Sequence, residues 1–209
     1  MLDVRKIRLT LELREAGITN SNVLSAIEKI PREIFIPDNF RNQAYENIAL
    51  PIGDDQTISQ PYIVALMTQS LELEKYHKVL ELGTGSGYQC AILSLLVRRV
   101  YTVERIKSLL VKAETKFKEL KLTNIVTKHG DGNLGWKEQI PFDRIIFTAA
   151  TNEISINFFN YISENGIIIA PIISGSKQIL KKYIKKNENI NSENLTDVLF
   201  VPNLSGIKD

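Results

Sequence analysis

The order of apolar and polar residues divides this chain into a helical N-terminal part and a longer part in which strands and helices take turns. In the first part, apolar residues recur about every three or four positions, which predicts amphipathic helices. Gly17 and Pro31 follow the first two of these patterns and end the predicted helices. The helices predicted in this part span residues 2–16, 22–30 and 61–73.

The residues between the second and third predicted helices, 31–60, are predicted to form a loop. They contain several prolines and show little periodicity, apart from a short helical pattern at 40–45. Ser59 is placed to cap the third helix, and Pro61 lies in its first turn, where a missing N–H costs nothing.

From Lys78 onward, short apolar runs alternate with helical patterns. Strands separated by helices predict a parallel sheet wound with right-handed crossovers, which is an α/β, Rossmann-like fold with helices on both faces. The predicted strands are 79–82, 100–103, 125–128, 142–148 and 167–173, and the predicted helices between them are 91–97, 106–120 and 154–163.

Two final apolar runs, 178–185 and 196–201, follow each other without a helix between them. They predict an antiparallel hairpin at one edge of the sheet, joined by the asparagine-rich loop 187–194. The lysines of this region alternate with apolar residues, which favours a strand with a solvated face over a polyanion site. These lysines are Lys177, Lys181, Lys182, Lys185 and Lys186.

Composition fits one enzyme-sized domain. The 209 residues are 44% hydrophobic and 24% charged, enough to bury a full α/β core. We expect a single domain over 1–209, in which 1–76 form a helical and loop extension and 77–209 the Rossmann-like core. The net charge of +2 is too small to indicate nucleic acid.

The chain shows no sign of export or membrane insertion. Its first residues carry charge throughout and lack the apolar core of a signal peptide, and no run approaches transmembrane length. The single cysteine, Cys90, lies on the apolar side of a predicted helix and is expected to be a small core residue in a reducing compartment. We therefore expect a cytoplasmic protein.

The most informative motif is KVLELGTGSGYQ, residues 78–89, in which a strand pattern breaks into glycines at alternate positions. Glycine permits positive φ and close approach of a ligand, and a βα turn of a parallel sheet is where nucleotide-like ligands bind. A dinucleotide fingerprint needs a glycine where Tyr88 stands, and a P-loop needs a lysine that this turn lacks. The remaining form, with Gly83, Gly85 and Gly87, resembles the first motif of S-adenosylmethionine-dependent methyltransferases.

Two acidic residues at the ends of later strands favour the same kind of site. Glu104 ends the second strand, about twenty residues after Gly83, and is placed to accept hydrogen bonds from ribose hydroxyls. Asp131 follows the third strand between two glycines and is placed to accept an adenine amino proton. The alternatives are an ordinary charged strand end and an ordinary Asp-Gly turn.

The sequence offers few candidate catalytic or metal-binding residues. His77 and His129 are interpreted as surface or loop residues, and no Ser-His-Asp, Cys-His or metal-ligand spacing appears, so we expect no metal. The small residues 148–150 stand where amine methyltransferases resemble one another in carrying N-P-P-Y and where metal-dependent ones carry carboxylates. A carboxylate acceptor, with a pKa of about 4, fits this inventory because it needs desolvation and positioning rather than a base.

Several segments together resemble the protein-L-isoaspartate O-methyltransferase family: AYENIALPIGDDQTISQPYIVALMT, VLELGTGSGYQ, VYTVERI, GDGNLGW and IPREIFIP. The likeness extends over nearly the whole chain, and TISQP is specific to that family. It implies methyl transfer from S-adenosylmethionine to the α-carboxylate of L-isoaspartyl residues in damaged proteins and peptides. Apart from the resemblance, we expect a monomer without nucleic-acid or membrane partners.

The resemblance also assigns roles to residues. It implies that Ser59 is catalytic and that Thr57, Ile58 and, on the last strand, Val201 line the acceptor site. The implied cofactor-binding residues are Pro61, Tyr62, Ile63, Val64, Glu81, Gly83, Thr84, Gly85, Gly87, Glu104, Arg105, Asp131 and Gly132.

Two departures from the family pattern stand out. Asp54 and Asp55 precede Gln56 where family members commonly have a glycine, so that loop flexibility or attraction for an anionic peptide differs. The residues 201–204 are also less apolar than the usual continuation. The alternatives are a methyltransferase of the same fold that acts on a small molecule or RNA, and a cofactor-binding module without catalysis.

Overall fold

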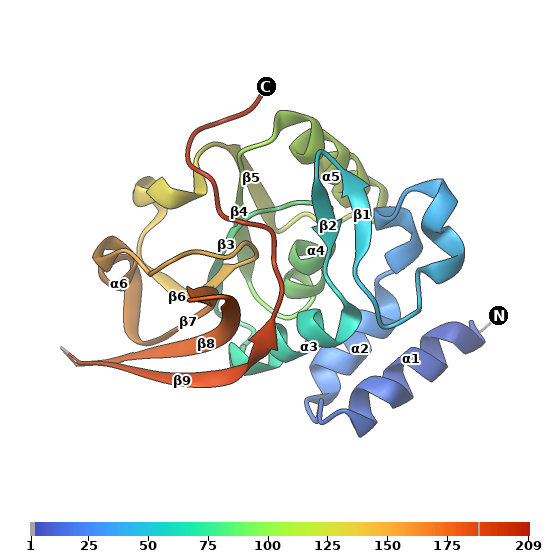
Figure 1. Ribbon diagram of the computed structural model, residues 1–209, viewed down its shortest axis with the longest axis horizontal. Coiled ribbons are helices and arrows are strands. Elements are labelled where there is room, and N and C mark those ends of the chain that lie inside the picture. The colour runs from blue at the N-terminus through green and yellow to red at the C-terminus, as the bar shows by residue number, and fades with distance from the viewer. Residues whose placement is uncertain (1–2, 188) are drawn as a thin grey trace.

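A computed structural model describes residues 3–187 and 189–209 (Figure 1). Its main feature is a seven-stranded sheet in the order β5-β4-β3-β6-β7-β8-β9. The strands from β3 to β7 pair in parallel, and β8 and β9 pair antiparallel at one end, so the predicted α/β fold with a C-terminal hairpin is confirmed. The strands are β3 (Lys78–Leu82), β4 (Arg99–Glu104), β5 (Ile125–His129), β6 (Phe142–Phe147), β7 (Ile162–Ser174), β8 (Lys177–Lys186) and β9 (Asn189–Val198).

Both faces of the sheet are covered, as the inner strand β3 shows. In β3, Val79 packs into one hydrophobic cluster, while Leu80 and Leu82 pack into the other. The first cluster holds the helices α1 to α5, and the second holds α6. The helices are α1 (Val4–Glu15), α2 (Ser21–Lys29), α3 (Pro61–Ser70), α4 (Tyr88–Ser94), α5 (Lys107–Glu119) and α6 (Ile156–Tyr161), with 3-10 turns η1 (Arg32–Phe35), η2 (Asp38–Gln43), η3 (Gly132–Leu134) and η4 (Lys137–Gln139).

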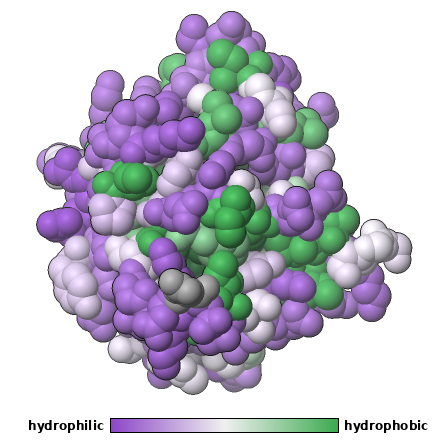
Figure 2. Space-filling model, turned by 90° about the vertical axis from the view of Figure 1, so that its left-hand side faces the viewer, coloured by the Kyte–Doolittle hydropathy of each residue, from purple (hydrophilic) through white to green (hydrophobic). Residues whose placement is uncertain are grey.

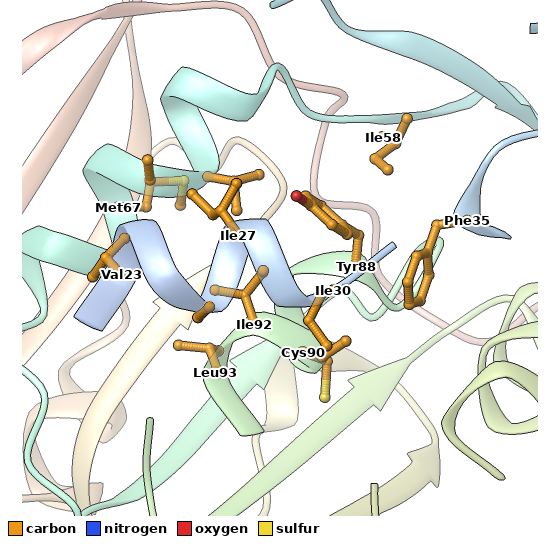
Figure 3. Close-up of a cluster of buried hydrophobic side chains, with 14 of the residues drawn as sticks. Val23, Ile27, Ile30, Phe35, Ile58, Met67, Tyr88, Cys90, Ile92 and Leu93 are labelled. Atoms are coloured by element: carbon orange, nitrogen blue, oxygen red, sulfur yellow. The ribbon is translucent and has the colours of Figure 1, made fainter. Parts of the chain in front are cut away.

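The N-terminal helices are part of the larger cluster. Figure 3 shows side chains of α2, α3 and α4 meeting there, among them Ile27, Met67 and Ile92, with Cys90 buried as predicted. Asp3 and Asn20 cap α1 and α2 by accepting backbone N–H bonds. The predicted cap of α3 was wrong, because Gln60 occupies that position and Asn47 Oδ1 instead accepts the Tyr62 N–H at 2.9 Å.

The region predicted as a loop contains a hairpin of β1 (Leu50–Gly53) and β2 (Gln56–Ile58). Asp54 and Asp55 form its two-residue turn with φ of 52° and 57°, the left-handed pair that a type I′ turn requires. Asn-Gly is the usual signal for that turn, and strands of four and three residues are too short to show alternation. The loop prediction was therefore wrong here.

The C-terminal hairpin also differs from prediction. Asn189 to Asn194 pair with β8 instead of forming a loop, because an edge strand with both faces exposed tolerates polar residues. β9 ends at Val198, so Val201 lies beyond the last strand rather than on it. Lys182 is not solvated: it is 8% exposed and pairs with Glu72 at 2.6 Å and Glu193 at 3.5 Å.

The histidine predictions are confirmed in part. His77 lies in the loop before β3 but is buried, and its Nδ1 accepts the Glu74 N–H at 2.9 Å. Burial lowers the pKa of His77, because a charged imidazolium is disfavoured away from water. His129 ends β5 and is half-buried.

The face of the molecule drawn in Figure 2 is largely polar. Seen from the left-hand side of Figure 1, hydrophilic side chains cover most of the molecule and apolar ones gather near the middle of that face (Figure 2). None of the helices in 3–187 and 189–209 is both long enough and apolar enough to cross a bilayer.

Gly87, which precedes α4, provides a test of how tightly the glycine turn is packed. Its φ is +90°, and an added Cβ would lie 2.8 Å from the Phe117 ring and 3.0 Å from Ala113. Gly17, with φ of +99° and open space around it, is a matched control. We expect Gly17→Ala to lose about 1 kcal/mol of unfolding free energy from backbone strain alone, and Gly87→Ala about 2–4 kcal/mol from strain and overpacking. Urea unfolding measures both, and equal losses would contradict this packing.

Candidate functional site

The glycine turn after β3 lies at the carboxyl edge of the sheet, between the ends of β4 and β6. Gly83 donates its N–H to the Val103 carbonyl at 2.9 Å, and Thr148 donates its N–H to the Leu82 carbonyl at 3.0 Å. A Cβ at Gly83 would collide with the Thr148 hydroxyl, so only glycine fits there. The turn is therefore held between two neighbouring strands.

Glu104 fastens this turn to the end of β4. One carboxylate oxygen accepts the Gly85 N–H at 2.8 Å and the other accepts the Ile106 N–H at 2.9 Å. The residue is 5% exposed, and each oxygen keeps a further lone pair. The carboxylate thus shapes the turn and still has acceptor capacity toward the cleft that it borders.

The structure brings most of the predicted site residues around one cleft. The cleft lies where the glycine turn, β2 and the residues after β9 approach one another. The predicted residues that line it are Thr57, Ile58, Ser59, Val64, Gly83, Thr84, Gly85, Glu104, Arg105, Gly132 and Val201.

Six predicted residues stand outside that lining, as far as the described part of the chain shows: Pro61, Tyr62, Ile63, Glu81, Gly87 and Asp131. Ile63 borders a neighbouring groove, and Gly87 packs behind the turn. Asp131 turns its carboxylate toward its own loop and the C-terminal tail, because Oδ1 accepts the Asn133 N–H at 2.8 Å and Oδ2 the Gly206 N–H at 2.7 Å.

Glu81 supports the turn from beneath. It is fully buried and accepts a hydrogen bond from the Thr102 hydroxyl, which lies 2.7 Å from the Thr84 hydroxyl in the turn. Loss of hydration on burial raises the pKa of Glu81 to about 8. The carboxyl is therefore mainly protonated at neutral pH. Burial likewise raises the pKa of the Cys90 thiol beside it.

A groove of about 440 Å³ adjoins the cleft. Thr57, Ser59, Thr148 and Val201 line both, so they mark the junction between them. Within the described residues, no group forms a hydrogen bond with the Ser59 hydroxyl. The junction thus offers an unengaged hydroxyl donor, and its lining contains no histidine or cysteine.

Apart from the predicted Val201, the C-terminal tail, residues 199–209, contributes to the site in a way that sequence reasoning missed. Its 202–204 segment lines the cleft, and Asn203 donates its N–H to the Ala150 carbonyl at 2.7 Å. Further along, Lys208 donates its N–H to the Arg105 carbonyl at 2.7 Å. The tail has neither periodicity nor a motif that signals these bridges.

Other cleft residues were also missed, although some carried a signal. Met67 and Gln89 face the cleft from α3 and α4, the two helices that flank the glycine turn in the chain. Thr148 and Ala149 belong to the small-residue segment that the sequence places at the acceptor side. Across residues 3–187 and 189–209, no group of three or more histidine, cysteine or acidic residues is arranged to hold a metal ion.

Comparison with known proteins gives consistent results. A family model described as Protein-L-isoaspartate(D-aspartate) O-methyltransferase (PCMT) matches residues 4–208. Proteins named Protein-L-isoaspartate O-methyltransferase are similar, from Maricaulis maris (48% identical over 204 residues, covering 98% of this chain and 96% of the relative) and Dictyoglomus turgidum (51% over 190 residues, covering 91% and 86%).

Solved structures are similar as well. One named protein-L-isoaspartate O-methyltransferase has a TM-score of 0.86 and 27% identity and covers 94% of this chain and 65% of its own. A putative protein-L-isoaspartate O-methyltransferase from Plasmodium falciparum, in complex with S-adenosyl-L-homocysteine, has a TM-score of 0.82 and 24% identity, covering 94% and 97%. At 24% identity, the likeness to the Plasmodium falciparum structure shows the fold alone.

The buried Glu81 predicts a pH-dependent stability. Its pKa is higher in the folded chain than the ordinary 4.5, so its contribution is fully present below pH 4.5 and is lost as the pH rises through about 8. We expect Glu81→Gln, which keeps an acceptor for Thr102, to remove a decline of up to about 1.4 kcal/mol per pH unit in that window. Urea unfolding from pH 5 to 8 measures the slope, and parallel curves for the two proteins would contradict the assignment.

Proposed function

Because this chain belongs to the protein-L-isoaspartate O-methyltransferase family, we propose that its cleft holds S-adenosylmethionine and that the adjoining groove holds the isoaspartyl peptide. The protein is a repair methyltransferase that uses S-adenosylmethionine to methylate isoaspartyl residues of damaged proteins and peptides. We divide the site into these two parts because of one observation. The Ser59 hydroxyl, which has no hydrogen-bond partner among the described residues, lies where the cleft and the groove meet.

The cleft residues fit an adenosyl sulfonium ligand. The glycine turn offers backbone without Cβ atoms at Gly83 and Gly85, where the methionine part lies in our proposal, with Thr84 between them. Glu104 retains acceptor capacity for ribose hydroxyls, and Arg105 lies next to it in the lining.

The adenine end of the proposed site is formed by Asp131 and Gly132. Gly132 lines the cleft, and an added Cβ there would contact Leu82 at 3.7 Å. Asp131 Oδ2 accepts a bond from Gly206, which leaves a second lone pair for the adenine amino group. In this arrangement the tail and the ligand share one carboxylate.

The beginning of α3 closes the cofactor side. Val64 lines the cleft and Ile63 lines the groove, so this first turn separates the two compartments. Pro61 and Tyr62 set its direction, since Tyr62 is tied to Asn47. Glu81 and Gly87 act behind the glycine turn, the first through Thr102 and the second through close packing.

The reaction needs positioning more than proton transfer. When bound, S-adenosylmethionine supplies an electrophilic methyl group. The acceptor carboxylate is ionised at neutral pH, with a reference pKa of about 4, so no residue has to remove a proton. Ser59 donates a hydrogen bond that fixes this carboxylate, while Thr57, Ile58 and Val201 shape the wall around it and exclude water.

Repair is completed outside the protein. The backbone amide nitrogen that follows the methylated residue attacks the ester carbonyl and expels methanol, which forms a succinimide. Hydrolysis of the succinimide returns part of the product as normal aspartate. The enzyme is therefore required only for the transfer that makes a good leaving group.

The proposal also covers the domain organisation, oligomeric state, compartment and partners of the protein. We infer one methyltransferase domain over 1–209 that works as a monomer in the cytoplasm, without nucleic-acid or membrane partners. The small net charge of +2 supports the last point. Methylation of a small molecule or RNA, or cofactor binding alone, is not favoured by family membership.

Substrate choice tests the assignment directly. Incubation with labelled S-adenosylmethionine and two peptides of identical sequence, one with an isoaspartyl and one with an aspartyl linkage, is expected to label only the isoaspartyl peptide. The free α-carboxylate exists at that residue in the isoaspartyl peptide alone. Equal labelling of the two peptides would contradict the repair function, and cofactor binding without transfer would favour a binding module.

Ser59→Ala tests the donor at the junction. A hydrogen bond to a charged group contributes about 1.5–3 kcal/mol, so we expect kcat/KM for the isoaspartyl peptide to fall about 10- to 100-fold. The Kd for S-adenosylhomocysteine should stay within about twofold, since the acceptor side alone is altered. Ser59→Thr keeps the hydroxyl and is the matched control. A loss of cofactor affinity as large as the loss of transfer would argue against this role.

A further inference from the structure

Arg32 is a buried cation that the proposed reaction leaves unused. It opens η1 in the IPREIFIP segment and is fully buried, with 0% exposure. Within the described residues it has no carboxylate partner, and its Nε has no hydrogen bond. Burial lowers the pKa of Arg32 to about 10, which leaves it charged at neutral pH. Burying a charge is unfavourable unless other contacts compensate, so the groups that Arg32 contacts indicate its purpose.

All of its hydrogen bonds go to backbone carbonyls at the base of the β1–β2 hairpin. Nη1 donates to Ala44 at 2.8 Å and to Glu46 at 3.4 Å. Nη2 donates to Ile48 at 3.0 Å and to Ser59 at 3.0 Å. The guanidinium therefore joins the chain entering the hairpin to the chain leaving it.

We call these four hydrogen bonds of Arg32 the clamp. The clamp lies next to the last backbone pair of the β1–β2 hairpin. The last backbone pair there is Leu50 with Ile58, and Ile48 and Ser59 continue the two strands toward Arg32. A single nitrogen, Nη2, holds both carbonyls, because the two strands no longer bond to each other at this point. The backbone of Ser59 is thus fixed by Arg32 and not by strand pairing.

The other contact of Arg32 is with the cofactor side. Its guanidinium carbon lies 5.7 Å from the centroid of the Tyr88 ring, within the range of a cation–π interaction. Tyr88 begins α4 directly after Gly87 and lines the cleft. Phe35, from the same 3-10 turn as Arg32, packs edge-on against this ring at 5.5 Å, and Figure 3 shows the two rings in the core below Ile58.

We propose that Arg32 is a positioning residue for methyl transfer, which holds Ser59 at a set distance from the glycine turn. The inference rests on the proposed role of Ser59 as the donor to the acceptor carboxylate. A displacement of about 1 Å between reacting groups is enough to lower a rate about 100-fold. Arg32 contacts neither ligand and acts through the Ser59 carbonyl and the Tyr88 ring.

A lysine is not equivalent here. The planar guanidinium directs five N–H donors along a fork that spans four carbonyls, whereas an ammonium offers three donors from one point. Arg32→Lys therefore keeps the charge and loses the geometry. Phe35→Leu is the matched control: it disturbs the same buried turn, where Phe35 is 1% exposed, but has no bond to Ser59.

The experiment is a double-mutant cycle of Arg32→Lys with Ser59→Ala. We expect Arg32→Lys to lower kcat/KM for an isoaspartyl peptide about tenfold or more, with the Kd for S-adenosylhomocysteine changed less than about threefold. In the Ser59→Ala background the same change should have little further effect, because the group that it positions is gone. Phe35→Leu should act independently of Ser59→Ala. Multiplicative effects of Arg32→Lys and Ser59→Ala would overturn the proposal.

Hydrogen exchange supplies a readout that does not depend on activity. In the presence of saturating S-adenosylhomocysteine, which stabilises the folded state, Arg32→Lys should speed exchange of the β1–β2 amides at least about tenfold, while α4 and α5 stay protected. Unchanged hairpin exchange, or a variant that does not fold even with this ligand, would overturn the positioning role. A wild-type protein inactive on the peptide would count against the proposed function alone, since the exchange result still decides the role of Arg32.

Discussion

The Glu104 carboxylate, held between the Gly85 and Ile106 N–H groups, is the interaction on which the rest of the site depends. It joins the glycine turn after β3 to the end of β4, and parallel pairing of β3 with β4 and β6 sets the distance over which it acts. The carboxyl ends of these strands meet at one edge of the sheet, where ligands of such folds bind. The glycine turn therefore has a fixed position at that edge. Within the core, the hydrogen-bonded hydroxyls of Thr102 and Thr84 support the glycine turn.

The proposed acceptor side lies on a different part of the chain and has to be aligned with the glycine turn. The β1–β2 hairpin carries Ser59 at its base, where Arg32 clamps it. At its tip, Asp54 accepts hydrogen bonds from the Ser108 hydroxyl at 2.9 Å and from Lys208 at 3.3 Å. Both of these side-chain pairs are exposed and contribute little to stability, so the tip is held more weakly than the base. Asp54 thus attaches the hairpin to α5 and to the tail.

Much of this architecture is predictable because it depends on local pattern. Helical periodicity locates α2 and α3, and the spacing from Gly83 to Glu104 indicates the cofactor side. The β1–β2 hairpin was missed because its strands are too short for alternation and its turn is Asp-Asp. The burial of Lys182 depends on Glu72, which is far away in the chain. The C-terminal tail is held by backbone hydrogen bonds, which no pattern of residue types predicts. The role of Ser59 was inferred from family resemblance. The structure adds the hydrogen bond from Arg32 to the Ser59 carbonyl, on which the proposed positioning role rests.

The central claim is that Ser59 marks the meeting point of cofactor cleft and peptide groove. A crystal structure with S-adenosylhomocysteine and an isoaspartyl peptide tests it most directly. The account predicts the adenosine ribose at Glu104 and the peptide α-carboxylate within hydrogen-bond distance, about 2.5–3.0 Å, of the Ser59 hydroxyl. A peptide bound with its α-carboxylate away from Ser59, or with the groove empty, would contradict it.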